Sequence, residues 1–172
     1  MSNQASLFEE KPRYVIDTNV VVSFMHHSED EFYGSDVFKP QWEFIEGLLE
    51  RGVIVAPRKV EDELKKWCIE IPEMAAWLKK NAHVFTDVSS EQLNASKPIL
   101  AKYEVYGSTE NYVGDLSVIG LASSMSIAVL SLEGKKPQNS FKRPKIPNVC
   151  DEFGVECYSV TGFLRKEKFG ST

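Results

Sequence analysis

The stretch from Tyr14 to Phe24, Tyr-Val-Ile-Asp-Thr-Asn-Val-Val-Val-Ser-Phe, decides the fold because it places a carboxylate inside an apolar run. Residues 14–16 predict a short buried strand, and a charge at its end persists only when it is paired, hydrogen-bonded or bound to a metal. Thr18 and Asn19 follow as capping residues, so a helix is expected next. Ligands of open α/β sheets lie at the carboxyl ends of strands, where Asp17 is expected. The alternative is that Asp17 only caps this helix through its own side chain.

The composition is that of an ordinary globular protein. With 172 residues, 42% of them hydrophobic, the chain can bury the core of one domain without disulfides. Its net charge of -5 means that any nucleic-acid contact must come from a local basic patch. Cys68, Cys150 and Cys157 lack metal-type spacing and are interpreted as reduced thiols of a cytoplasmic protein. Residues 1–11 carry no secretory signal and are expected to be a poorly ordered lead-in to a domain over 12–172, and no apolar run is long enough to span a membrane.

Strand and helix patterns alternate along the rest of the chain. Continuous apolar runs at 53–56 and 127–130 predict strands that are covered on both faces, as in parallel sheets. Weaker strand signals lie at 83–85 and 155–158. This alternation predicts five parallel strands in one three-layer α/β domain.

One predicted helix carries an acid in its apolar stripe. After Pro57, the residues Val60, Leu64 and Trp67 stand on one helical face. Glu63 fills the i+3 position of that same stripe. A charge there needs a partner, and on spacing alone a salt bridge and a metal ion are about equally good candidates.

A second helix is predicted to open at Gly114, after a polar loop over 107–112. Asp115 stands at the head of its apolar face, with Val118 and Ile119 at the i+3 and i+4 positions. The alternative is that Asp115 only interacts favourably with the dipole at the helix N-terminus.

The apolar run at 127–130 leads into Ser131 and Glu133, which share one face and leave the sheet at the edge where Asp17 is expected. A dense basic segment without acids follows, with Lys135, Lys136, Lys142, Arg143 and Lys145. Its ordinary interpretation is a solvated loop. Contact with a phosphate backbone becomes attractive if the acids form a nuclease site beside it.

Asp17, Glu63, Asp115 and Glu133 thus come from four separate elements, each flanked by apolar residues. Carboxylates that cluster repel each other and are stable at neutral pH mainly when divalent cations neutralise them. Hard oxygen ligands select Mg²⁺ or Mn²⁺ over zinc. A pair of such ions about 3.5 to 4 Å apart activates water and stabilises both the attacking and the leaving oxygen of a phosphodiester.

In this order the motifs resemble the PIN domain, a family of metal-dependent ribonucleases common in bacterial and archaeal toxin/antitoxin pairs. The first signature, an apolar strand ending in Asp, Thr and Asn, matches residues 15–19. The second, third and fourth signatures are similar to residues 60–64, 114–122 and 129–133. The tail over 146–157 looks like a PIN-like subgroup long classified as a domain of unknown function.

The resemblance implies a central parallel sheet in the order 3-2-1-4-5, with Asp17 and Glu133 ending neighbouring strands. It implies an endoribonuclease that leaves 5′-phosphate and 3′-hydroxyl ends, with one or two Mg²⁺ or Mn²⁺ ions held by the four acids. Asn19 and Ser131 would orient Asp17 and the water around it. Two departures from the family pattern are Glu133 in place of the more frequent Asp and Ser131 in place of Thr.

The implied role is that of a toxin, with RNA as substrate and with an antitoxin protein and a second copy of the chain as partners. Two alternatives stand beside it. One is a catalytically silent PIN-like module that binds RNA or protein and whose acids only form salt bridges. The other is a phosphotransferase that phosphorylates Asp17, although such enzymes usually carry a second Asp where Asn19 stands.

Overall fold

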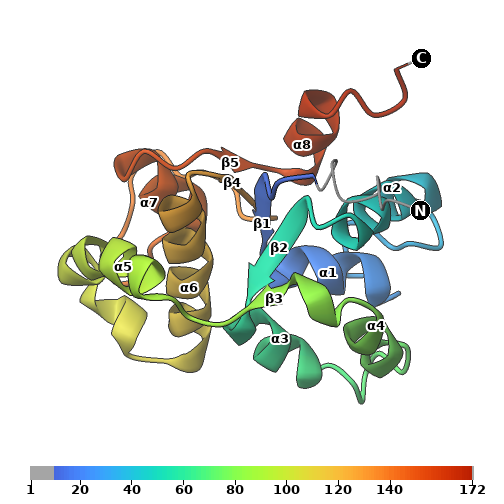
Figure 1. The fold of residues 1–172 in the computed structure, drawn as a ribbon, viewed down its shortest axis with the longest axis horizontal. Helices are drawn as coiled ribbons and strands as arrows, with labels where there is room; N and C mark the ends of the chain where they lie inside the picture. Colours follow the sequence, from blue (N-terminus) through green and yellow to red (C-terminus); the bar gives the residue numbers. More distant parts are fainter. Residues whose placement is uncertain (1–9, 172) are drawn as a thin grey trace, which may run out of the picture.

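The computed structural model describes residues 10–171 and is built around a parallel sheet in the order β3-β2-β1-β4-β5 (Figure 1). The strands are β1 (Tyr14–Ile16), β2 (Ile54–Pro57), β3 (Phe85–Thr86), β4 (Ala128–Leu130) and β5 (Cys157–Tyr158). The predicted α/β class, the five parallel strands and the strand order are therefore confirmed.

Helices cover both faces of this sheet. They are α1 (Thr18–Met25), α2 (Lys39–Glu50), α3 (Arg58–Lys65), α4 (Met74–Lys80), α5 (Ser90–Lys102), α6 (Glu110–Met125), α7 (Ile146–Glu152) and α8 (Val160–Lys166). In Figure 1, α1, α2 and α4 lie on one side of the sheet, and α5, α6 and α7 lie on the other. Helix α3 contacts both α1 and α6, so these three helices meet beside the carboxyl ends of the central strands.

The central strands are buried because their residues are apolar on both faces. β1 pairs with β4 over three residues, and the last pair is Ile16 with Leu130. Both of these side chains are almost fully inaccessible to solvent. The register brings the residues that follow the two strands, Asp17 and Ser131, to the same edge of the sheet.

Two local predictions were wrong in their boundaries. Helix α6 begins at Glu110, because the Thr109 side chain accepts the Tyr112 N–H at 3.5 Å and caps the helix there. The predicted polar loop over 107–112 is therefore partly helical, and Asp115 lies in the second turn of α6. The strand predicted at 83–85 is mostly a 3₁₀ turn, Ala82–Val84, which leads into β3.

The lead-in predicted over residues 1–11 lies outside the described residues except for its last two. Of these, Glu10 accepts a hydrogen bond from Arg51 Nε at 3.1 Å. Within residues 10–171, no helix combines the length and the apolar character that crossing a membrane requires.

Candidate functional site

The four predicted acids line one cavity of about 350 Å³ beside the carboxyl edge of the sheet. Its walls come from α1, from α3 and the two residues after it, from the first turns of α6, and from the segment after β4. The lining residues are Asp17, Thr18, Asn19, Glu63, Lys66, Trp67, Asn111, Asp115 and Glu133. Asp17 and Glu133 are 116 positions apart in the chain, and both line this cavity because β1 and β4 are neighbouring strands.

Asp17 lies at the junction of β1 and α1 with only 3% of its surface exposed. Its N–H donates to Leu130 O at 3.0 Å, which fixes the residue against the end of β4. The buried Ser131 hydroxyl donates to Asp17 Oδ2 at 3.4 Å. In the described part of the chain this carboxylate makes no capping hydrogen bond, so helix capping does not account for its burial.

Glu63 is held between α1 and α6 by two residues that the sequence analysis did not assign to the site. The Thr18 hydroxyl donates to Glu63 Oε2. On the other side, a Cβ atom at Gly114 would lie 1.8 Å from Glu63 Oε1, so the carboxylate occupies the space of the missing side chain. A glycine inside a helix lowers the stability of the helix by about 1 kcal/mol relative to alanine. This unfavourable residue was the signal in the sequence that pointed to a role for Gly114.

Glu133 connects the cavity to the segment that follows β4. Its N–H donates to Ser131 Oγ at 3.1 Å, and its Oε2 accepts the Ile146 N–H at 2.7 Å. Its Oε1 lies 3.8 Å from Lys145 Nζ. The backbone of Glu133 is therefore fixed by Ser131, and its side chain is fixed by the first residue of α7.

Burial and the charges of neighbouring acids raise the pKa of Asp17 and Asp115. Burial, followed by the charges of Glu63 and Glu133, raises the pKa of Asp17 to about 7. Burial, followed by the charges of Asp17, Glu133 and Glu63, raises the pKa of Asp115 to about 8. Burial also raises the pKa of Glu63. Full ionisation of this cavity at neutral pH therefore requires an additional positive charge.

The donor set fits a hard divalent cation in its chemistry, because the cavity offers four carboxylates and the side-chain amides of Asn19 and Asn111. Across residues 10–171, however, no three His, Cys, Asp or Glu side chains are grouped so as to hold one metal ion together. Three of the carboxylates accept hydrogen bonds from the protein, Asp17 from the Ser131 hydroxyl, Glu63 from the Thr18 hydroxyl and Glu133 from the Ile146 N–H.

The other predicted site residues are more dispersed. Asn19 lines the cavity and is exposed. Of the basic segment, Lys145 is the residue that approaches an acid of the cavity, whereas Lys135 Nζ pairs with Asp151 Oδ2 at 2.7 Å. The remaining cations of this segment, Lys136, Lys142 and Arg143, are exposed.

Three further lining residues were not predicted as part of the site. Lys66 was not singled out, Asn111 was placed in a loop, and Trp67 was assigned to the apolar stripe of its helix. In the structure Trp67 is only partly buried. The end of α3 gave no signal in the sequence, because the exposure of these residues depends on how α3 packs against α1 and α6.

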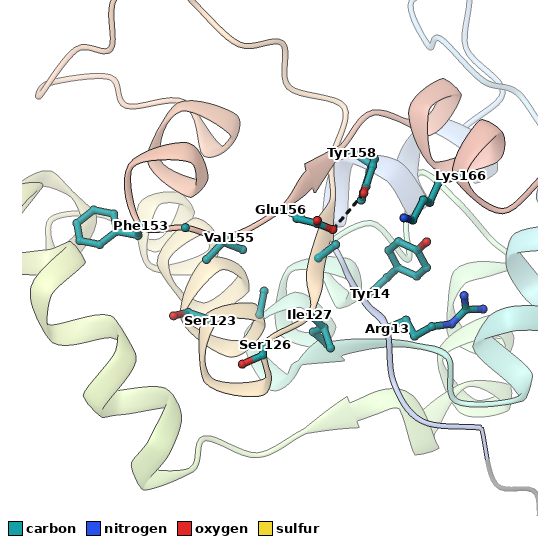
Figure 2. A pocket seen from close by; sticks show the side chains of 13 residues that line it. Arg13, Tyr14, Ser123, Ser126, Ile127, Phe153, Val155, Glu156, Tyr158 and Lys166 are labelled. Atoms are coloured by element: carbon teal, nitrogen blue, oxygen red, sulfur yellow. Dashed lines mark hydrogen bonds between the residues drawn. The ribbon is translucent and has the colours of Figure 1, made fainter.

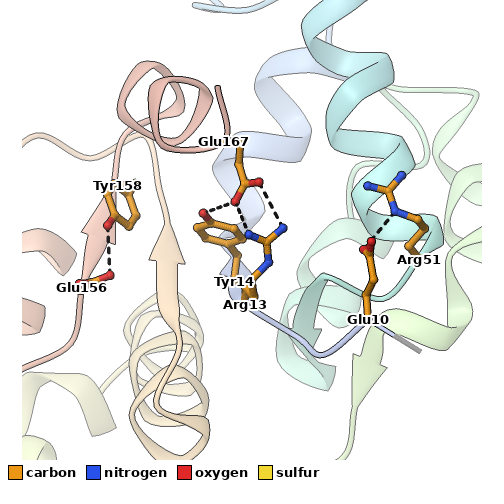
Figure 3. A network of polar contacts seen from close by, with 7 residues as sticks. All are labelled: Glu10, Arg13, Tyr14, Arg51, Glu156, Tyr158 and Glu167. Carbon is orange, nitrogen blue, oxygen red and sulfur yellow. Dashed lines mark hydrogen bonds and ion pairs between the residues drawn. The ribbon is translucent and has the colours of Figure 1, made fainter. Parts of the chain in front are cut away.

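A second cavity, of about 570 Å³, lies at the opposite, amino edge of the sheet (Figure 2). Arg13, Tyr14 and Lys166 are among its lining residues. Beside it, Glu167 accepts two hydrogen bonds from Arg13, at 2.9 and 3.2 Å, and one from the Tyr14 hydroxyl at 2.5 Å (Figure 3). The charge of Glu167 is thus neutralised by a guanidinium group.

A family model described as "Domain of unknown function (DUF4411)" matches residues 14–170, which include all four acids of the first cavity. No curated protein matches the chain.

Proposed function

The chain belongs to the family described as Domain of unknown function (DUF4411), and from the acid-lined cavity we propose that it is a Mg²⁺- or Mn²⁺-dependent endoribonuclease. One observation carries the proposal. Asp17, Glu63, Asp115 and Glu133 line a single cavity, and burial together with mutual repulsion raises the pKa of Asp17 and Asp115 to about 7 and 8. A site of this kind is stabilised by a divalent cation.

In this proposal Asp17 and Asp115 hold the main ion, Glu63 binds it directly or through water, and Glu133 completes the site or holds a second ion. The bound ion supplies Lewis-acid polarisation of the phosphodiester and activation of water. The protein contributes the orientation of the ligands. Ser131 fixes the carboxylate of Asp17 by a hydrogen bond of 3.4 Å.

The position of Glu63 is controlled in the same way. The Thr18 hydroxyl binds one of its oxygens, and the absence of a side chain at Gly114 leaves room for the other. Because Asp17 is almost fully buried, bulk water has little access to its side of the cavity and electrostatic interactions there are strong. These contacts fix the positions of the Asp17 and Glu63 carboxylates at the cavity, and neither contact is a helix cap or a salt bridge.

The remaining features of the proposal come from the resemblance of the motifs to PIN domains. They are the role of toxin in a toxin/antitoxin pair, an antitoxin protein and a second copy of the chain as partners, and a cytoplasmic location. RNA contact by the segment from Lys135 to Lys145 belongs to the same proposal, with Lys145 nearest the acids.

One observation favours the alternative of a catalytically silent module that binds RNA or protein. In the described chain the carboxylates of Glu63 and Glu133 are engaged by Thr18 and Ile146, and no three acids are grouped around one point. A nuclease therefore requires Mg²⁺ or Mn²⁺ to compete with these hydrogen bonds. The silent module predicts that neither ion binds.

The test is cleavage of a 5′-labelled RNA by the full chain in Mg²⁺ or Mn²⁺, compared with Asp17→Asn and Asp115→Asn. Loss of a ligand that stabilises the transition-state charge is expected to lower the rate about 100-fold or more. The matched control is Glu61→Gln, because Glu61 lies on α3 near Glu63 but pairs with Arg58 and Lys65, each at 3.0 Å.

The control should cleave like the wild type. Equal cleavage by wild type, Asp17→Asn and Asp115→Asn, with all three folded, would remove these acids from the reaction. If the wild type neither cleaves RNA nor binds Mn²⁺ in calorimetry, the nuclease proposal is wrong and the silent module is favoured.

A further inference from the structure

The acid-lined cavity also carries a cation and an indole ring that the proposed metal site does not use. Lys66 and Trp67 follow directly after α3, three and four residues beyond Glu63, and line the same cavity. Neither residue belongs to the basic segment after β4. They therefore form a feature of the site separate from the acids and from that segment.

Trp67 differs from the other two tryptophans of the chain in its exposure. Trp42 and Trp77 are 7% and 6% exposed and stack on each other, with ring centroids 6.1 Å apart. Trp67 is only partly buried, and its ring lies against that of His26 at a centroid distance of 5.3 Å. The indole is thus supported by a neighbouring ring while it remains accessible from the cavity.

Lys66 supplies positive charge at the same place. Its Nζ lies 3.7 Å from Glu110 Oε2, and 63% of the side chain is exposed. Glu110 is paired more closely with Lys59 Nζ, at 2.7 Å. Two lysines therefore share one acid at the start of α6, and the more distant of them, Lys66, keeps an exposed ammonium group that a phosphate can reach.

This combination matches the requirements of a single-stranded nucleic acid. Unpaired bases stack on aromatic side chains whatever their sequence, while phosphates bind lysine and arginine. In a duplex the base faces are already stacked and are not available to an indole. Because Lys66 and Trp67 line the same cavity, one nucleotide can contact both.

We propose that Lys66 and Trp67 form a subsite for an unpaired nucleotide of single-stranded RNA, with the base on the Trp67 ring and a phosphate on Lys66. The subsite rests on the proposed nuclease function, because it places the RNA strand next to Asp17, Glu63 and Asp115. It also predicts which RNA the protein prefers, namely single-stranded over fully paired RNA.

The test uses the full chain carrying Asp115→Asn, which keeps the RNA intact, and a labelled single-stranded RNA in Mg²⁺. Affinity is measured by fluorescence anisotropy over a series of salt concentrations. Trp67→Leu is expected to weaken binding at least about fivefold without changing the salt dependence, because it removes one stacked base. Trp67→Phe, which keeps an aromatic ring, should retain most of the affinity.

Lys66→Ala is expected to have a different signature. Losing one phosphate contact should reduce the slope of log K against log salt by about 0.7 for a single strand. The matched control is Lys39→Ala, because Lys39 is 74% exposed and lies 3.7 Å from its acid partner Glu43, yet does not line the cavity. This control should leave both affinity and slope unchanged.

A second measurement reports on Trp67 directly. Single-stranded RNA should quench the tryptophan fluorescence of the Asp115→Asn protein, and the quenching should disappear in Trp67→Leu. A fully paired duplex of the same sequence should quench less.

The outcomes separate this proposal from the nuclease proposal. If Trp67→Leu and Lys66→Ala bind RNA with unchanged affinity, slope and quenching while the wild type cleaves RNA, the subsite is wrong and the nuclease proposal stands. If RNA quenches Trp67 and binding depends on both residues while the wild type does not cleave RNA, the subsite stands and the nuclease proposal is wrong.

Discussion

Two acids at opposite edges of the sheet, Glu167 and Asp17, have different partners. At the amino edge, Glu167 is bound by the Arg13 guanidinium and by the Tyr14 hydroxyl, so its charge is neutralised within the protein. At the carboxyl edge, Asp17 accepts its hydrogen bond from the uncharged Ser131 hydroxyl, and its pKa is raised to about 7. The same fold thus pairs Glu167 with a guanidinium group where it stabilises the structure, whereas the buried Asp17 at the cavity accepts a hydrogen bond from an uncharged hydroxyl.

The difference favours the carboxyl edge as the candidate functional site. Natural sequences usually violate local rules of stability at functional sites and compensate elsewhere. The cavity at the amino edge is the larger of the two, about 570 Å³ against 350 Å³, yet the perturbed carboxylates line the smaller one. Chemistry, and not cavity size, therefore identifies the candidate site.

The largest expected effect is on the pH dependence of the metal-free protein. The pKa of Asp17 and Asp115 rises from 3.8 when unperturbed to about 7 and 8 in the folded protein. Between these values the folded state keeps protons that the unfolded state has lost, so the free energy of unfolding falls as the pH rises from about 4 to 8. In EDTA the melting temperature should therefore drop by at least about 5 °C between pH 5 and pH 8.

Adding Mn²⁺ at pH 8 should restore the lost stability, because the ion binds the ionised carboxylates of the folded state. Asp115→Asn serves as the control and should flatten the pH dependence. A melting temperature in EDTA that is as high at pH 8 as at pH 5 would contradict the predicted repulsion between the acids.

The next effect is on the position of Glu63. A methyl group at Gly114 would lie 1.8 Å from Glu63 Oε1, so Gly114→Ala must displace that carboxylate. We expect Mn²⁺ to bind about 10- to 100-fold more weakly, as measured by calorimetry, because supporting contacts of metal ligands have effects of this size. The helix itself should gain up to about 1 kcal/mol from alanine, which keeps the variant folded.

The matched control is Gly47→Ala in α2, where the new Cβ would meet only Arg51 Nη1, at 3.5 Å. That variant should gain stability and bind Mn²⁺ like the wild type. Unchanged Mn²⁺ affinity in Gly114→Ala would show that Glu63 does not contact the ion.

The smallest effect is expected at the amino edge. Glu167→Ala removes the acceptor of Arg13 and Tyr14 and should lower the free energy of unfolding by about 1 to 2 kcal/mol, since Arg13 is half-exposed and its ion pair is partly screened. RNA cleavage by this variant should stay at the wild-type rate. Glu156→Ala, which removes an exposed partner of Tyr158, should change stability by less than about 0.5 kcal/mol.

Lower stability with unchanged RNA cleavage in Glu167→Ala would assign a stabilising role to the amino edge and leave the proposed reaction to the carboxyl edge. A loss of RNA cleavage in folded Glu167→Ala would instead mean that the two edges are coupled.

Most of the fold could be predicted from the sequence, because its strands are short apolar runs that end in polar residues. The run at 127–130 and the strand before Asp17 were identified this way, and the resemblance to PIN domains implied the strand order. The start of α6 was placed four residues too late, since Thr109 caps the helix from within a polar stretch whose composition predicts a loop.

The acids of the cavity could be predicted, but their surroundings could not. An acid inside an apolar stripe is a visible anomaly, as Glu63 illustrates. Lys66 and Trp67 are ordinary residues in their local sequence and line the cavity only when α3 packs against α6. Roles that depend on long-range packing leave no periodic signal in one sequence.

The central claim is that the acids at the carboxyl edge share a divalent cation. The most direct measurement is the anomalous difference density of crystals grown or soaked with Mn²⁺. We predict a peak in the cavity within coordination distance of Asp17 and Asp115. Crystals at saturating Mn²⁺ with no peak between these two carboxylates would contradict the claim.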